Sequence, residues 1–186
     1  MQQDIRNGGL TFLDYIKEIK NFKKFQKEKY NITCFIFTYN QENTIERAIK
    51  SILEQKTKYE FLIRVINDAS TDRTTEIVME YIRKYPEKIE MVLYEKNTNK
   101  KCISAAFRGI STDYYSTLDG DDYWCDNLKI EKSLDYLESN KNVVMYIHDV
   151  LYISKFKEES LMHDIIKLDK DFSNPFDISN LINSHW

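Results

Sequence analysis

The sequence predicts an α/β fold in which a mostly parallel β-sheet is flanked by helices. Short apolar, β-branched runs typical of buried strands alternate with segments of helical periodicity. The runs begin about 25 to 30 residues apart, which is the spacing that a strand–helix–strand crossover requires. Each run ends on polar residues. The four predicted strands are Ile32–Thr38, Phe61–Ile66, Ile89–Tyr94 and Tyr114–Leu118.

Composition excludes several classes of protein. The net charge of −3 and the pI of about 5.7 give no reason to expect a nucleic-acid partner, because such proteins usually carry a basic face. The three cysteines, Cys34, Cys102 and Cys125, lack the spacing of metal ligands, so reduced thiols are expected. No apolar run approaches the roughly 18 residues of a membrane span, and the N-terminus lacks the apolar core of a signal peptide. We therefore expect a cytoplasmic protein.

Residues 1–30 are predicted to form a basic amphipathic helical extension. Between Thr11 and Tyr30 there are six lysines against three acidic residues, and apolar side chains recur at helical spacing. Such a helix usually packs on its own domain. The alternative is peripheral contact of residues 10–30 with the cytoplasmic face of a membrane or with a protein partner.

The helices predicted after each strand complete the crossovers. Asn43 and Glu46 have the spacing of a capping box, and an apolar face follows them up to Leu53. A second helix is expected between the cap residues Ser70–Asp72 and Pro86. The remaining predicted helices are Lys101–Ile110 and a helix capped by Asp126 that contains Leu128, Leu134 and Leu137.

An acidic turn follows the fourth predicted strand. Asp119, Asp121 and Asp122 lie within four positions, and their charges repel one another unless a cation binds. Mg²⁺ and Mn²⁺ take oxygen ligands, and one or two protein carboxylates leave coordination positions for phosphate oxygens. A solvated acidic turn is the alternative. In an open parallel sheet, however, ligands bind outside the carboxyl ends of the strands, where this turn would meet Thr38–Asn40 and Asn67–Asp68.

The glycine content restricts how a phosphate can be bound. Only four glycines occur, Gly8, Gly9, Gly109 and Gly120, and they form neither a dinucleotide-binding fingerprint nor a P-loop. An EF-hand also fails, because its twelfth position would be Ile130 instead of Glu. The interpretation that remains is a diphosphate held by a metal on carboxylates, with base and ribose bound further along the strand edge.

Three motifs resemble the signatures of the family 2 glycosyltransferases. They are Phe-Thr-Tyr-Asn-Gln-Glu-Asn at 37–43, Asn-Asp-Ala-Ser-Thr-Asp at 67–72 and Leu-Asp-Gly-Asp-Asp-Tyr-Trp at 118–124. The resemblance covers about residues 31–153. It implies a glycosyltransferase-A fold, whose Rossmann-like half binds the nucleotide sugar. It also implies an inverting, metal-dependent enzyme that moves a sugar from a nucleotide diphosphate to a saccharide or lipid-linked acceptor hydroxyl.

The resemblance also implies roles for individual residues. Thr38 and Tyr39 would lie against the nucleobase, and Asp68 would accept a hydrogen bond from a uracil-type N–H, which favours UDP. Asp119 would face the ribose or the metal. Asp121, with Asp122, would ligate Mn²⁺ or Mg²⁺.

This sequence departs from the family pattern in three places. Phe37 stands where many members have Pro. A family arginine that contacts the diphosphate is replaced within Ala106–Phe107, and either Lys100 or Lys101 could supply the charge; a solvated lysine is the alternative. The acceptor-activating base is expected beyond Trp186. Residues 31–155 would then be the nucleotide-sugar-binding domain, and 156–186 the start of a truncated acceptor-side region.

Three other expectations complete the sequence analysis. His148-Asp149 lies within the apolar run Val143–Ile153 and is assigned a structural role at the end of a strand. A nucleotide- or metal-binding module without transferase activity is the main alternative function. An interaction domain that acts through the N-terminal helix is the second alternative.

Overall fold

A computed structural model describes residues 16–18, 30–99, 102, 106, 107, 110, 112–148 and 150. The chain divides into two compact units, Met1–Lys132 and Ser133–Trp186, and each is described by itself. No helix in these described ranges is long and apolar enough to cross a membrane.

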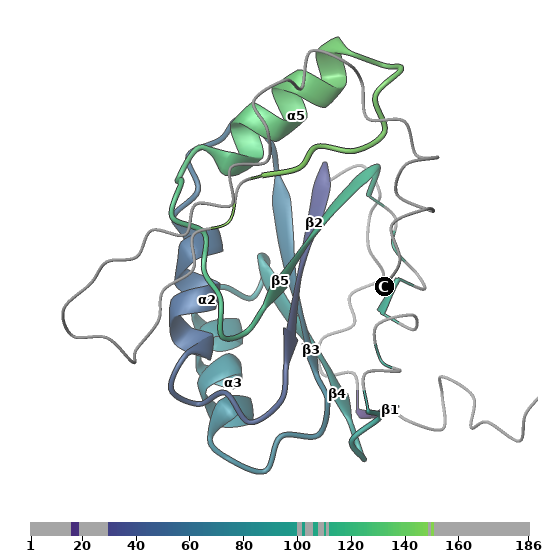
Figure 1. Ribbon diagram of the computed structural model, residues 1–186. Helices are drawn as coiled ribbons and strands as arrows, with labels where there is room; N and C mark the ends of the chain where they lie inside the picture. The colour runs from purple at the N-terminus through teal and green to yellow at the C-terminus, as the bar shows by residue number, and fades with distance from the viewer. Residues whose placement is uncertain are drawn as a thin grey trace, which may run out of the picture. The chain divides into compact units, whose positions relative to one another are not determined.

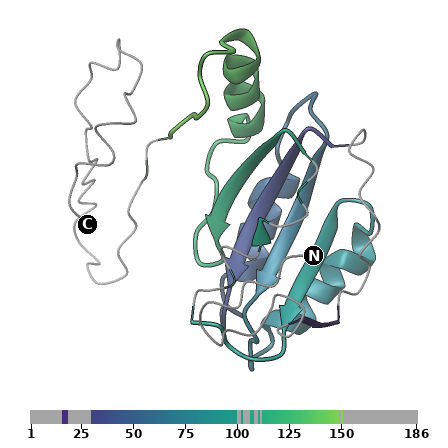
Figure 2. The same ribbon diagram turned by 90° about the vertical axis from the view of Figure 1, so that its right-hand side faces the viewer.

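The first unit contains a five-stranded sheet in the order β1-β4-β3-β2-β5 (Figures 1 and 2). Strands β2 to β5 are mutually parallel, and β1 pairs with β4 in the antiparallel direction at the edge. The prediction of a mostly parallel sheet is confirmed. The strands are β1 (Ile16–Glu18), β2 (Ile32–Thr38), β3 (Phe61–Asn67), β4 (Ile89–Tyr94) and β5 (Tyr114–Asp119).

The strand order creates a switch point beside β2. The chain runs from β2 to β3 and β4 on one side, and then returns to place β5 on the other side of β2. A crevice at such a point is the usual ligand site of open α/β sheets.

Helices α2 (Ile45–Leu53) and α3 (Thr74–Lys84) lie on the same face of the sheet (Figure 1). Four apolar side chains of α2 are fully buried, those of Ile45, Ala48, Ile49 and Ile52. The predicted capping box at Asn43 and Glu46 is wrong, because α2 starts after Thr44 and has no side-chain cap. Glu46 instead accepts a hydrogen bond from Tyr81, 2.9 Å away on α3, and pairs with Lys50.

The opposite face of the sheet has its own apolar cluster. Phe35, Ile66, Val92 and Tyr94 are buried together with Cys102 and Ala106, which come from the segment predicted as the helix Lys101–Ile110. Cys102 and Ala106 are both helical, and most other residues of that segment lie outside the described ranges. Side chains alternate along β2, so Phe35 faces this cluster while Cys34 and Ile36 face the other way.

Residues 16–18 correct the prediction for the N-terminus. They form β1 instead of a helix, with Ile16 opposite Tyr94 and Glu18 opposite Leu93. The physical reason is that β4 would otherwise expose an unpaired row of backbone groups at the sheet edge, which a short strand can satisfy. The rest of the predicted extension, residues 1–15 and 19–29, lies outside the described residues.

Helix α5 (Lys129–Ser139) follows Asp126, whose carboxylate accepts a hydrogen bond from the Leu128 amide at 2.9 Å. In the second unit the predicted strand within Val143–Ile153 is wrong for residues 143–148, which are irregular. A strand needs a paired neighbour, and no described strand pairs with these residues. His148 instead contacts the Tyr146 ring at 4.9 Å, so its predicted place at a strand end is also wrong; Asp149 is not described.

A buried ion pair lies between two central strands. Arg64 on β3 and Glu90 on β4 are paired in register, and both are at most 5% exposed. Their side chains form a hydrogen-bonded ion pair. Burial raises the pKa of Glu90, and the Arg64 guanidinium opposes this shift.

Glu90→Gln should lower the free energy of unfolding by about 3–5 kcal/mol, because it deprives a buried guanidinium of its counter-charge. Urea unfolding at neutral pH measures this loss. The double variant Arg64→Leu/Glu90→Leu should recover most of it, because both charges leave the sheet together. Equal stability of Glu90→Gln and the wild type would contradict the role given to the pair.

Candidate functional site

The carboxyl ends of β2, β3 and β5 meet at one edge of the sheet. Thr38 is paired with Asn67, and Phe37 with Asp119. The hydrogen bonds continue one residue beyond the strands: the Asp68 amide donates to the Thr38 carbonyl at 3.0 Å, and the Gly120 amide donates to the Phe37 carbonyl at 2.8 Å. These bonds bring the Thr38, Asp68 and Asp119 segments side by side at the switch point.

Exposure differs among the predicted site residues. Thr38 and Asp68 are buried, at 4% and 6% exposed, whereas Tyr39 presents 46% of its surface. Asp119 is exposed. The acidic residues after it, Asp121 and Asp122, are exposed as well. Lys101 and Lys100 lie outside the described residues.

The Asp68 carboxylate is oriented by the loop that follows β4. Its Oδ1 atom accepts a hydrogen bond from the Thr98 amide at 2.8 Å, and the Thr98 hydroxyl accepts one from the Cys102 amide at 2.9 Å. Asn97 donates to the Asp68 carbonyl at 3.4 Å. A fourth strand end, that of β4, therefore contributes to the site, which the sequence motifs did not indicate.

Left-handed backbone occurs in the loops of the site. Asn40, Ala69 and Asn99 have φ values of 51°, 62° and 52°. Each follows one of the parallel strands β2, β3 and β4 within five residues. Asparagine tolerates this region because its short polar side chain can bond locally, but alanine lacks that compensation. The Asn67 side chain supports the Ala69 turn by accepting a hydrogen bond from the Ser70 amide at 2.9 Å.

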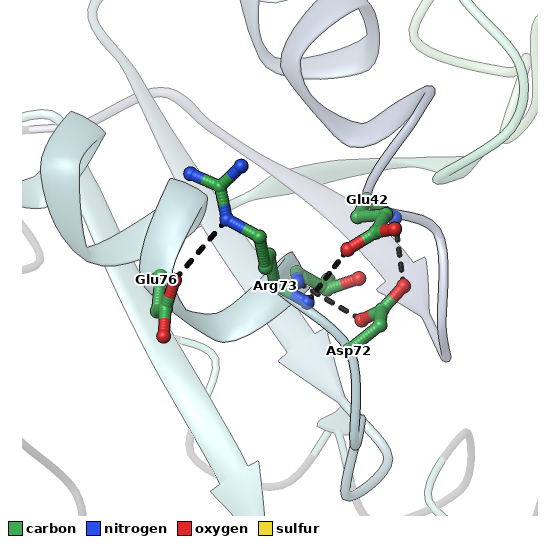
Figure 3. A network of polar contacts seen from close by, with 5 residues as sticks. Glu42, Asp72, Arg73 and Glu76 are labelled. Carbon is green, nitrogen blue, oxygen red and sulfur yellow. Dashed lines mark hydrogen bonds and ion pairs between the residues drawn. The ribbon is translucent and has the colours of Figure 1, made fainter.

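Side chains join the loop after β2 to the loop after β3. The Glu42 amide donates to Asp72 Oδ2, and the Arg73 amide donates to Glu42 Oε2, both at 3.0 Å (Figure 3). Asp72 Oδ1 also accepts from the Thr74 amide at 2.9 Å. Further bonds of this kind join Asn40 to Ser70 and Thr71, and Gln41 to Thr74. We call this set the loop clamp.

The loop clamp fixes the turn that carries Tyr39 against the turn that follows Asp68. Partial burial opposes the charge on Asp72, but hydrogen bonds from Thr74 and Glu42 outweigh it, so the pKa of Asp72 lies below its usual value. The sequence analysis assigned Asp72 only to helix capping. It missed the contact to Glu42 because that contact joins residues 30 positions apart.

Asp72→Asn should destabilise the protein by about 1–2 kcal/mol at pH 7, because an amide nitrogen replaces one of two charged acceptors. A carboxylate with a lowered native pKa contributes stability above its unfolded pKa, and that contribution disappears as the pH falls through the native value. The difference in free energy of unfolding between the wild type and Asp72→Asn should therefore shrink as the pH falls below about 4. Urea unfolding across this range measures it.

Glu80→Gln, an exposed substitution on α3, is the matched control and should change stability little at any pH. A stability difference for Asp72→Asn that stays constant between pH 7 and the acid range would contradict the charged role.

Arg47 also reaches the acidic turn. It extends from the first turn of α2 and donates from Nη2 to the Asp121 carbonyl at 3.1 Å. Its guanidinium carbon lies 4.2 Å from the centroid of the Tyr123 ring. From the sequence, a cation at the site was expected only at Lys100 or Lys101. The position of Arg47 in the sequence could have indicated this contact. The helix after β2 begins near the carboxyl end of that strand, so exposed residues in its first turn lie close to the site.

Comparison with known proteins decides the family. A model of the family described as glycosyl transferase family 2 matches residues 33–183. The chain belongs to glycosyl transferase family 2. An uncharacterized protein of Mycobacterium tuberculosis is 34% identical over 120 residues, which cover 62% of this chain and 34% of that protein. The chain thus spans about a third of the length of the first curated relatives that it matches.

Solved structures show that this family 2 chain has the glycosyltransferase-A fold. Staphylococcus aureus TarS 1-349 in complex with UDP aligns with a TM-score of 0.54 and 24% identity over 60% of this chain and 33% of TarS. The mannosyltransferase PcManGT from Pyrobaculum calidifontis, in complex with GDP-Man and Mn²⁺, aligns with a TM-score of 0.53 and 23% identity, covering 59% and 32% of the two chains. The fold predicted from the sequence is confirmed.

The acidic turn of this family 2 chain has a donor set that suits a hard divalent cation. Its carboxylates are exposed at the end of β5, and oxygen ligands are those that Mg²⁺ and Mn²⁺ prefer. Among the described residues no three His, Cys, Asp or Glu side chains form a metal cluster. A metal that takes its other ligands from phosphate and water needs only one or two protein carboxylates, so the residues present fit such an ion.

Gly120 lets the acidic turn approach β2. A Cβ at this position would lie 2.3 Å from Gln41 Oε1 and 3.0 Å from Thr38 Oγ1. Both oxygens are buried, and neither has a hydrogen-bond partner. The turn is closed by a bond from the Asp122 amide to the Asp119 carbonyl at 3.0 Å. Any side chain at position 120 would push the turn away from Thr38.

Gly120→Ala should lower the free energy of unfolding by about 1–3 kcal/mol through overpacking against Thr38 and Gln41. Adding Gln41→Ala should recover part of the loss, because it removes the nearest contact while the Gln41 amide still binds Thr74. Thermal or urea unfolding of both variants, with Gln41→Ala alone as the control, measures the coupling. Strict additivity of the two substitutions would argue against this contact.

Proposed function

We propose that this chain carries the donor-binding part of a glycosyltransferase that transfers a sugar from a UDP-sugar to an acceptor hydroxyl with inversion. The observation that carries the proposal is the meeting of Thr38, Asp68 and the acidic turn at the switch point. In this proposal residues 31–155 form the nucleotide-sugar-binding domain, and 156–186 begin the acceptor side.

The chemistry follows from the positions of these groups. The exposed Tyr39 ring offers a flat surface on which a base can stack. In the proposal the Asp68 carboxylate, at the neighbouring strand end, accepts a hydrogen bond from uracil N3–H. In the proposal Asp119 binds the ribose or the metal, and Asp121 with Asp122 ligates Mn²⁺ or Mg²⁺. Lys101 is proposed as a further diphosphate contact.

The leaving diphosphate gains negative charge in the transition state, and a bound divalent cation would neutralise that charge without a proton transfer. The chain's own contribution is to hold the donor with its diphosphate over the acidic turn. The base that deprotonates the acceptor is proposed to lie beyond Trp186. The acceptor is proposed to be a saccharide or a lipid-linked saccharide.

The redox state of the cysteines supports a cytoplasmic location for this reaction. All three cysteines, Cys34, Cys102 and Cys125, are free thiols, and two of them are buried. Unpaired thiols of this kind are usual in proteins from a reducing compartment.

Calorimetric titration tests the donor site. UDP should bind more tightly with Mn²⁺ than with EDTA. It should also bind more tightly than CDP, because cytosine N3 carries no proton that could be donated to the Asp68 carboxylate. Asp121→Asn should weaken Mn²⁺-dependent UDP binding by about tenfold or more, since a charged metal ligand is lost. Asp113→Asn, at the opposite end of β5, is the matched control. Absence of any metal-dependent UDP binding by the wild type would refute the proposal.

Sugar release from UDP-sugars is measured with this chain and with a longer form that includes the acceptor side. This comparison separates a transferase from a binding module. Transfer by the longer form supports the enzyme. Donor binding without transfer by either form would favour a nucleotide-binding module.

A further inference from the structure

Arg47 connects α2 to the acidic turn through two contacts with different chemistry. Nη2 donates to the Asp121 carbonyl at 3.1 Å, and the guanidinium lies over the Tyr123 ring at 4.2 Å. Both partners belong to the turn that follows β5, 74 positions after Arg47 for the first contact. Arg47 is exposed, but both the hydrogen-bonding edge and the planar face of its guanidinium contact the acidic turn.

The contact to Asp121 is made to the peptide carbonyl and not to the carboxylate. Arg47 therefore fixes the backbone at this position, and this contact leaves the carboxylate oxygens of Asp121 available to a metal. Lysines on the following segment contact residues beyond the turn: Lys129 lies 4.7 Å from the Trp124 ring centroid, and Lys132 pairs with Asp126 at 2.7 Å. Neither of these contacts fixes the peptide that carries Asp121.

A backbone fixed in this way matters because the turn concentrates negative charge. Asp119, Asp121 and Asp122 are exposed, and their mutual repulsion favours conformations in which the carboxylates separate. The backbone bonds from Gly120 to Phe37 and from Asp122 to Asp119 close the turn and join it to β2. Arg47 adds side-chain contacts at Asp121 and Tyr123.

We propose that Arg47 is a positioning residue that keeps the acidic turn in the geometry that binds a divalent cation and the donor diphosphate. This inference rests on the proposed donor site. Arg47 acts through the turn: it shapes the backbone that presents the carboxylates and takes no part in bond making or breaking.

Electrostatics and positioning predict opposite results when Arg47 is removed. A positive charge close to a cation site repels the cation, so charge removal by itself should strengthen metal binding. Loss of the hydrogen bond and of the ring contact should instead loosen the turn and weaken metal-dependent binding. Stronger metal-dependent binding after removal of Arg47 would indicate an electrostatic effect alone, and weaker binding would indicate the positioning role.

The experiment measures UDP affinity of the full chain by calorimetry in Mn²⁺ and again in EDTA. The dissociation constant in EDTA divided by that in Mn²⁺ is a ratio that reports how strongly the metal assists binding. Arg47→Met, which keeps the length but removes the charge and the donors, should reduce this ratio about tenfold while the affinity in EDTA stays within about twofold of wild type. The ratio for Arg47→Lys should lie between those of the wild type and Arg47→Met, because lysine keeps the charge but lacks the planar guanidinium group.

Lys50→Met is the matched control. It removes one positive charge from the same helix at an exposed position that pairs with Glu46, and the ratio should stay at the wild-type value. Hydrogen exchange gives a readout that does not depend on ligand. The amides of residues 119–123 should exchange faster in Arg47→Met than in Lys50→Met, because the turn has lost its outer anchor.

The outcomes separate failure of this inference from failure of the proposed function. A wild-type chain that binds no UDP in either buffer defeats the proposed function itself. A wild-type chain with metal-assisted binding, together with an unchanged or increased ratio in Arg47→Met, overturns the positioning role alone. An equal loss of affinity in Mn²⁺ and EDTA, or unchanged exchange at the turn, would also overturn it, since a general packing defect or a passive contact would then be sufficient.

Discussion

The position of β2 between β3 and β5 is the constraint on which the site depends. Because all three strands are parallel and in register, their carboxyl ends must finish at the same level. The residues that follow them are then neighbours whatever their separation in sequence. The apolar clusters on the two faces of the sheet hold this register, since a slip by one residue would turn Phe35 away from its cluster and expose it to the opposite face.

Polar side chains fix the loops at this shared edge of the sheet relative to one another. The carboxylates of Asp72, Glu42 and Asp68 each accept a hydrogen bond from a backbone amide of another loop. The loops are therefore fixed to one another by carboxylates instead of by regular secondary structure. Gly120 and Arg47 serve the same purpose for the acidic turn, one by permitting close approach and one by anchoring its far half. Carboxylates thus have two roles here, because those in the loop clamp are satisfied by amides while those of the acidic turn are exposed.

Periodicity and turn chemistry predicted the sheet well because each crossover is local. The bounds of β2 and β4 agree with the prediction, and β3 and β5 are each one residue longer. Errors occurred where long-range pairing decides the conformation. Ile16–Glu18 has helical periodicity but forms a strand at the open edge of β4, and residues 143–148 have strand composition but no strand to pair with. Arg47, Asp72 and Thr98 were missed as contacts of the site for the same reason, since no local spacing records a partner about 30 to 74 residues away.

The left-handed residues Asn40, Ala69 and Asn99 have one more consequence. None of them is glycine, so an unfolded chain visits these conformations rarely, and Ala69 must pay for its backbone with contacts from elsewhere. The bends at the candidate site can persist only after the sheet has assembled around them. An excised peptide carrying any one of these three residues should therefore be unstructured and should lack affinity for nucleotide, since recognition is a property of the assembled tertiary fold.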